Sequence, residues 1–214
     1  MYDLFNPIPD KLDDMPSINE GVDLSEIKGL IYIPNIITVT EERSLINSIN
    51  MESWLNDLKR RVQHYGYKYD YRTRALNYSM FLGTLPLWCQ PFIQKIRSRS
   101  LISENPDQLI VNEYLSGQGI ANHVDCQPCF GETIFSLSLG STCLMDFINI
   151  ETKEVKSVLL EPRSLLILSD KARYGWSHGI AARKSDQYKG QIFYRKTRIS
   201  LTFRKVIFEN NSLI

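Results

Sequence analysis

The stretch "KTRISLTFRKVIF", residues 196–208, alternates polar and apolar side chains in the way that is typical of a β-strand with one buried face. Because successive side chains of a strand point to opposite faces, it has one polar and one apolar face. The polar face carries Arg198, Ser200, Thr202 and Arg204, and the apolar face carries Ile199, Leu201 and Phe203. Two guanidiniums on one face could bind a dicarboxylate through paired hydrogen bonds. Alternation by itself favours a simpler interpretation, a polar stripe that faces solvent.

Five more short segments rich in β-branched or aromatic residues precede this stretch, and Gly, Pro, Asn or Asp separates most of them. They are QLIVNEYL (108–115), TIFSLSLG (133–140), TCLMDFINI (142–150), VKSVLLE (155–161) and RSLLILSD (163–170). Many short strands with turn residues between them are typical of a sandwich or jelly roll. We therefore predict an α+β fold that is mainly β, with this core in the C-terminal part of the chain.

The N-terminal half has a different pattern. Residues 29–37, GLIYIPNII, predict a strand. The stretch 40–49 predicts a helix with Thr40 as its N-cap, and 85–102 predicts a helix with Pro91 in its first turn. We expect helices packed onto the β core.

We predict two parts along the chain, an irregular segment over residues 1–28 and a single domain over 29–214. The formal net charge is +1, from 25 basic and 24 acidic residues, so no global field draws the protein to nucleic acid or to a membrane. No apolar run approaches the roughly 20 residues of a membrane span, and the N-terminus has no apolar secretory core. We expect a monomer in the cytoplasm or nucleus, without membrane contact. Its cysteines should then be thiols, namely Cys89, Cys126, Cys129 and Cys143.

The stretch "NHVDCQPCFG", residues 122–131, offers two candidate metal-binding pairs. A structural zinc site usually needs two C-x-x-C pairs, and this chain has only Cys126 and Cys129. His123 and Asp125 alternate on an extended segment, so they point the same way. A third ligand must come from elsewhere in the chain.

Two other histidines could complete the site, His64 and His178. His178 follows the apolar segment that ends at residue 170, which makes His123, Asp125 and His178 the natural triad. Two imidazoles and one carboxylate form the facial triad of non-haem Fe(II) oxygenases. The alternative for His178 is a strand-end histidine that bonds a backbone carbonyl.

Together these pieces resemble the AlkB family of Fe(II)- and 2-oxoglutarate-dependent dioxygenases over most of the chain after about residue 29. H-x-D, a distal His and R-x5-R in this order are jointly specific. The segments that carry the resemblance are NEY (112–114), HVD (123–125), SLSLGS (136–141), MDF (145–147), PRSLLIL (162–168), RYGWSHGI (173–180) and RISLTFR (198–204). The resemblance implies a double-stranded β-helix fold that binds Fe(II), 2-oxoglutarate and O2.

The resemblance also implies roles for single residues. His123, Asp125 and His178 would bind iron. Arg198 would pair with the distal carboxylate of 2-oxoglutarate, and Arg204 would lie by the carboxylate near iron. The side chains expected to hydrogen-bond 2-oxoglutarate are Asn112, Tyr114 and Ser200.

Residues 59–74, KRRVQHYGYKYDYRTR, interleave basic side chains with tyrosines. Basic groups meet phosphates and tyrosine rings stack on unpaired bases, although a strand with solvated side chains would show the same composition. In AlkB-like proteins this stretch is the lid over the substrate, so we predict a nucleotide-recognition lid over 59–84. The resemblance also points to position 127, where a bacterial repair branch has a carboxylate that contacts the base. The expected substrate contacts are Tyr69, Tyr71, Arg72, Arg74 and Gln127.

The expected function is oxidation of alkylated or otherwise modified bases in nucleic acid, including oxidative demethylation of RNA or DNA. Single strands and loops are the easier targets, because a base must leave its stack to reach iron. The segments RRVQHYGY and RYGWSHGI are most similar to the branch that hydroxylates a tRNA wobble uridine, which is one alternative. Hydroxylation of a protein or a small molecule, and a non-catalytic binding module, are the others.

Overall fold

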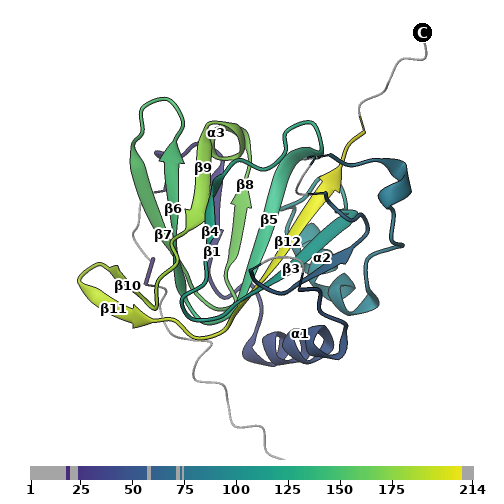
Figure 1. The fold of residues 1–214 in the computed structure, drawn as a ribbon, viewed down its shortest axis with the longest axis horizontal. Helices are drawn as coiled ribbons and strands as arrows, with labels where there is room; N and C mark the ends of the chain where they lie inside the picture. The colour runs from purple at the N-terminus through teal and green to yellow at the C-terminus, as the bar shows by residue number, and fades with distance from the viewer. Residues whose placement is uncertain (1–17, 20–23, 57–58, 71–72, 74, 209–214) are drawn as a thin grey trace, which may run out of the picture.

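The computed structural model describes residues 18–19, 24–56, 59–70, 73 and 75–208. Two antiparallel sheets dominate it (Figure 1). The six-stranded sheet has the order β1 (Leu30–Ile33), β8 (Leu165–Leu168), β5 (Phe130–Gly140), β12 (Arg198–Val206), β3 (Gln108–Tyr114) and β2 (Val62–Tyr65). The four-stranded sheet has the order β4 (Ile120–His123), β9 (Trp176–Ile180), β6 (Cys143–Asn149) and β7 (Val155–Leu160). This arrangement is the predicted jelly roll.

Strand β12 pairs with β3 on one side and with β5 on the other. Its apolar residues Ile199, Leu201 and Phe203 belong to a buried core, as the alternation predicts. Its polar face is also buried, because it lines a cavity together with residues of the other sheet. The interpretation of that face as a solvent-facing stripe is therefore wrong.

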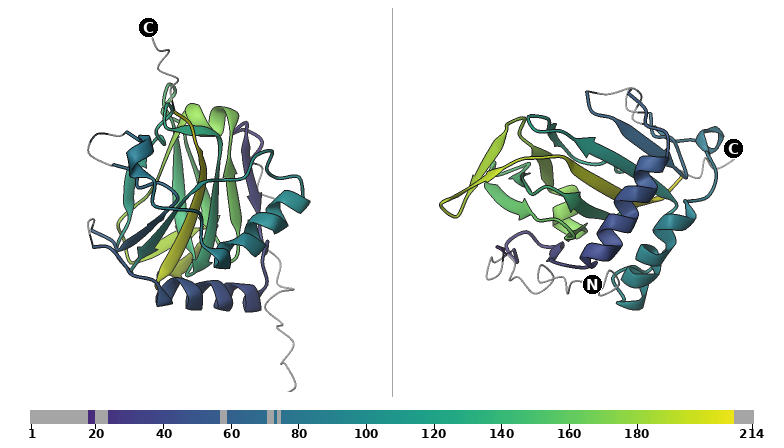
Figure 2. Two further views of the ribbon diagram at one scale, coloured as in Figure 1. Left: turned by 90° about the vertical axis from the view of Figure 1, so that its right-hand side faces the viewer. Right: turned by 90° about the horizontal axis from the view of Figure 1, so that it is seen from below.

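Helices α1 (Val39–Met51) and α2 (Gln90–Ser98) cover the outer face of the six-stranded sheet (Figure 2). Ile49 and Ile96 are fully buried in the same core as Phe203. Pro91 lies in the first turn of α2, as predicted, and the short helix η2 (Leu87–Cys89) precedes it.

The first helix begins earlier than predicted. Thr38, not Thr40, is the N-cap of α1, and it forms a capping box with Glu41. Its hydroxyl accepts from the Glu41 amide at 3.2 Å, and the Glu41 carboxylate accepts from the Thr38 amide at 2.7 Å. Thr40 is a plausible cap by residue type, but Thr38 has the acid three residues later that a capping box requires.

The four strands β4, β9, β10 (Ser185–Tyr188) and β11 (Gln191–Tyr194) were not predicted. Strands β10 and β11 form a hairpin, which Asp186 anchors. This buried carboxylate accepts from Arg195 at 2.6 Å and from the backbone amide of Leu144 on β6 at 3.0 Å.

The remaining short helices are η1 (Tyr78–Met80) and α3 (Asp170–Tyr174). In the described part of the chain, no helix is long and apolar enough to cross a bilayer.

Candidate metal and co-substrate site

A cavity of about 350 Å³ lies between the two sheets. Strands β3 and β12 supply its polar residues from the six-stranded sheet, and β4 and β9 supply two histidines from the other sheet. Its volume is within the range of small-molecule sites. The cavity brings together segments that lie far apart in the sequence, from Arg60 to Arg204.

His123, Asp125 and His178 meet at one wall of the cavity. Each offers one ligand atom, and these atoms all lie within 4.8 Å of one another. Strands β4 and β9 pair with His123 opposite His178, which sets the two imidazole rings 4.6 Å apart. Nδ1 of His123 lies 2.9 Å from the carbonyl oxygen of Ala121, a contact that leaves Nε2 for a ligand. The predicted triad is therefore brought together, and its donor set suits iron(II).

Asp125 is buried between the Arg204 guanidinium and the His178 imidazole. Arg204 donates to its Oδ1 at 2.5 Å, and Nε2 of His178 lies 3.6 Å from Oδ2. Although burial opposes ionisation, the nearby Arg204 and His178 hold the pKa of Asp125 well below its usual range. Burial lowers the pKa of His178 to about 4, so the imidazole is neutral and able to bind a metal at neutral pH.

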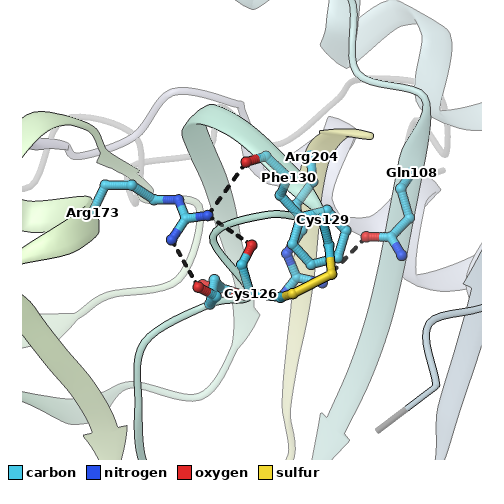
Figure 3. The surroundings of a disulfide bond; sticks show 7 residues. Gln108, Cys126, Cys129, Phe130, Arg173 and Arg204 are labelled. Atoms are coloured by element: carbon cyan, nitrogen blue, oxygen red, sulfur yellow. Dashed lines mark hydrogen bonds and ion pairs between the residues drawn. A yellow bond between two sulfur atoms is a disulfide. The ribbon is translucent and has the colours of Figure 1, made fainter. Parts of the chain in front are cut away.

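The loop that carries Asp125 is held from behind by Arg173 of α3, which is almost fully buried (Figure 3). Its guanidinium donates to the carbonyl oxygens of Asp125 at 2.9 Å and of Cys126 at 3.0 Å. Cys126 and Cys129 form a disulfide, so the prediction that both are thiols is wrong. Two cysteines three residues apart in a tight loop can approach closely, and composition does not reveal whether the loop folds that way. Cys89 and Cys143 are free thiols, as predicted, and both are buried.

Arg198 and Ser200 give the cavity an anion-binding end. Arg198 is 2 % exposed, and one of its amino groups donates to the Ser138 hydroxyl at 2.8 Å. Among the described residues, its buried Nε has no hydrogen-bond partner. A buried donor without a partner is costly, and a carboxylate in the cavity would satisfy it. Ser200 lies beside it, and its hydroxyl is 3.2 Å from that of Ser136. The residues present therefore fit a dicarboxylate such as 2-oxoglutarate.

Comparison with known proteins agrees with this chemistry. Residues 48–204 match the model of the 2OG-Fe(II) oxygenase superfamily. The chain belongs to this superfamily. Iron(II), 2-oxoglutarate and O2 are the reagents that the superfamily uses, and the cavity contains a triad for the metal.

Several relatives of this oxygenase are AlkB homologues. The alkylated DNA repair protein ALKBH8 homolog of Arabidopsis thaliana is 38% identical over 84% of this chain and 59% of its own length. The mouse tRNA (carboxymethyluridine(34)-5-O)-methyltransferase ALKBH8 is 38% identical over 83% of this chain and 30% of its own length. The uncharacterized protein L905 of Acanthamoeba polyphaga mimivirus is 37% identical over 86% of this chain and 87% of its own length. This chain thus spans less than two thirds of the length of the Arabidopsis and mouse relatives.

The fold of this oxygenase is that of AlkB homologues. The structure of OsALKBH1 superposes with a TM-score of 0.64 at 17% sequence identity, covering 83% of this chain and 98% of that chain. The likeness supports the predicted double-stranded β-helix.

Two of the predicted substrate contacts, Tyr69 and Gln127, lie within the described residues, and of these Tyr69 lines the cavity of the oxygenase. Tyr69 is 9% exposed and packs at the cavity wall, with its ring 5.5 Å from that of Phe130. Gln127 is exposed on the loop after Asp125 and does not line the cavity. Three further predicted contacts lie outside the described residues: Tyr71, Arg72 and Arg74.

The first two arginines of the basic stretch turn inward in this oxygenase. Nε of Arg60 donates to the side-chain oxygen of Asn112 at 2.8 Å, and Arg61 donates twice to Glu113 at 2.6 and 2.7 Å. These hydrogen bonds tie both side chains to β3. The sequence signal that could have revealed this is that Asn112 and Glu113 are polar residues in an otherwise apolar strand, and so need buried partners.

Proposed function

We propose that this oxygenase uses Fe(II), 2-oxoglutarate and O2 to oxidise a modified base in nucleic acid. The observation that carries the proposal is one cavity that holds the His123–Asp125–His178 cluster, the Arg198 guanidinium and the Tyr69 ring. When bound, iron and 2-oxoglutarate supply an oxidation that hydroxylates a C–H bond beside the metal. On an N-methyl group the hydroxylated product breaks down to formaldehyde and the bare base.

The proposed roles of the cavity residues follow from their positions. His123, Asp125 and His178 hold the iron, and Arg204 keeps Asp125 ionised and in place. Arg198 binds the distal carboxylate of 2-oxoglutarate, with Ser200 beside it. Arg204 follows Arg198 by six residues on the same face of β12 and would also lie by the carboxylate of 2-oxoglutarate that is near the iron. The other proposed contacts to 2-oxoglutarate are Asn112 and Tyr114.

A nucleic-acid substrate is supported by the relatives and by Tyr69. The names of the Arabidopsis and mouse relatives refer to alkylated DNA and to tRNA. A tyrosine ring at the cavity wall can stack on a base that has left its strand. Single strands and loops are the proposed targets, and Tyr71, Arg72, Arg74 and Gln127 remain proposed contacts. We further propose that the protein acts as a monomer in the cytoplasm or nucleus.

A second candidate is hydroxylation of a modified uridine at the tRNA wobble position. The 38% identity to the mouse protein, whose name specifies carboxymethyluridine 34 of tRNA, favours it. The match to the mouse protein covers 83% of this chain.

The proposal is tested by mass spectrometry of nucleosides from tRNA and DNA, before and after treatment with protein, Fe(II), 2-oxoglutarate and ascorbate. Loss of a methylated base with release of formaldehyde would support demethylation, and a gain of one oxygen on a tRNA uridine would support the second candidate. His178→Ala is the negative control. Turnover of 2-oxoglutarate that no nucleic acid stimulates, and that a peptide or small molecule does, would contradict both.

A further inference from the structure

We propose that Arg60 is a positioning residue for the co-substrate: it fixes the side-chain amide of Asn112 so that the NH2 group is presented to the cavity. The inference rests on the proposed binding of 2-oxoglutarate. Arg60 precedes β2 and lines the cavity, 52 residues before its partner on β3. It begins the segment RRVQHYGY (60–67), and it is not among the residues that the family resemblance assigns to iron or 2-oxoglutarate.

The orientation of the amide follows from hydrogen-bond chemistry. A guanidinium only donates, so the Asn112 atom that lies 2.8 Å from Nε of Arg60 must be the carbonyl oxygen Oδ1. The NH2 group of Asn112 is then left for a ligand in the cavity, which Asn112 also lines. Without Arg60 the amide could rotate and offer its oxygen instead, which would repel a carboxylate.

Arg60 also lies near Tyr114, another residue proposed to bind 2-oxoglutarate. The Arg60 guanidinium lies 5.3 Å from the centre of the Tyr114 ring, and the Arg198 guanidinium lies 5.5 Å from it. Burial raises the pKa of Tyr114, so its phenol stays protonated and can donate. The Arg198 guanidinium, the Asn112 NH2 group and the Tyr114 OH together favour a ligand that only accepts hydrogen bonds, which is the chemistry of a dicarboxylate.

Arg61 provides a matched control in the neighbouring position. It also ties the segment before β2 to β3, through two hydrogen bonds to Glu113, and its guanidinium lies 4.4 Å from the centre of the Trp54 ring. Neither Arg61 nor Glu113 lines the cavity. If Arg60 merely held the two segments together, substitutions at Arg60 and at Arg61 would have the same consequences.

The test measures 2-oxoglutarate binding to the Mn(II)-loaded protein by anaerobic calorimetry, with urea unfolding in parallel. We expect Arg60→Ala to raise the dissociation constant roughly tenfold, the size of one lost charged hydrogen bond. Arg60→Lys should recover part of that loss, because an ammonium can donate to Oδ1 of Asn112. Arg61→Ala should lower stability and change the dissociation constant less than about twofold.

A double-mutant cycle separates positioning from a direct effect. In an Asn112→Ala background, Arg60→Ala should cause little further loss of 2-oxoglutarate affinity, since the amide that it orients is gone. An additive loss in that background, or unchanged affinity in Arg60→Ala alone, would overturn the inference. Failure of the unsubstituted Mn(II)-loaded protein to bind 2-oxoglutarate would instead overturn the proposed function.

Discussion

The two sides of the six-stranded sheet are equally buried but chemically opposite. On the outer side, Leu201 and Phe203 of β12 are fully buried against the helices. On the inner side, Arg198 and Ser200 of the same strand are 2% and 5% exposed around an open cavity. Apolar burial on the outer side stabilises the fold, whereas buried polar side chains with unpaired donors on the inner side cost stability. Buried polar residues that lower the stability of the fold indicate a functional site.

The largest expected effect is the loss of turnover when a metal ligand on the inner side is removed. His178→Ala should abolish 2-oxoglutarate decarboxylation and iron binding, because two ligands do not hold the ion in place. His123→Ala and Asp125→Ala should do the same. Succinate release and bound iron measure the effect.

The two cysteines beside Asp125 provide the control for this loss. Cys126→Ser combined with Cys129→Ser should keep most of the iron and the turnover, since their sulfurs are joined to each other. If the cysteine variant lost its iron while His123→Ala kept it, the metal ligands would be the two cysteines and not His123 and Asp125.

On the outer side, Phe203→Ala should lower the free energy of unfolding by about 3–5 kcal/mol, because it leaves a cavity in a filled core. Its neighbour Thr202 faces the cavity, and Thr202→Ala should change the same quantity by less than about 1 kcal/mol. Urea unfolding of the two variants tests the comparison directly. Equal losses of unfolding free energy in the two variants would show that the outer face of β12 does not contribute more to stability than the inner face.

Arg198→Lys should affect co-substrate binding while cooperative unfolding is retained. Lysine keeps the charge and loses the planar fork that can bind a carboxylate at two points. The loss of one charged hydrogen bond, about 1.5–3 kcal/mol, corresponds to a rise in the KM for 2-oxoglutarate of roughly 10- to 150-fold. Steady-state kinetics measure it, and an unchanged KM would remove Arg198 from the co-substrate site.

The smallest expected effect is on nucleic-acid binding. Tyr69→Ala should weaken binding to a single-stranded oligonucleotide by about 1–3 kcal/mol, the contribution of one stacked base. The salt dependence of binding should be unchanged, because stacking releases no counterions.

Tyr78→Ala is the matched control for Tyr69→Ala. Tyr78 is 72% exposed, does not line the cavity, and stacks on Phe208 with ring centres 3.9 Å apart. Fluorescence anisotropy at several salt concentrations compares the two variants. A similar loss in both would indicate general surface contact, and no loss in either would leave a nucleic-acid substrate supported by the relatives alone.

The sequence predicted those helices and strands whose pattern of residue types is complete within one short stretch. The alternation at 196–208 became β12, and Pro91 lies in the first turn of α2. Strands β4 and β9 were missed although they carry two members of the predicted triad. Both strands are short, and their sequences show no strong alternation of polar and apolar residues. Pairing with neighbouring strands stabilises them, and that pairing cannot be seen in their composition.

Residue identity and order by themselves determined the fold class and the metal triad, because a strand's two faces and the ligand preferences of iron depend on residue type and spacing. Only the tertiary structure decided which partner each buried polar group meets. It turned the polar face of β12 into a cavity wall, turned Arg60 and Arg61 inward to β3, and joined Cys126 to Cys129. The physical reason is that a hydrogen bond or disulfide forms between groups that are close in space, and the distance between segments is set when the sheets pack, not by their separation along the chain.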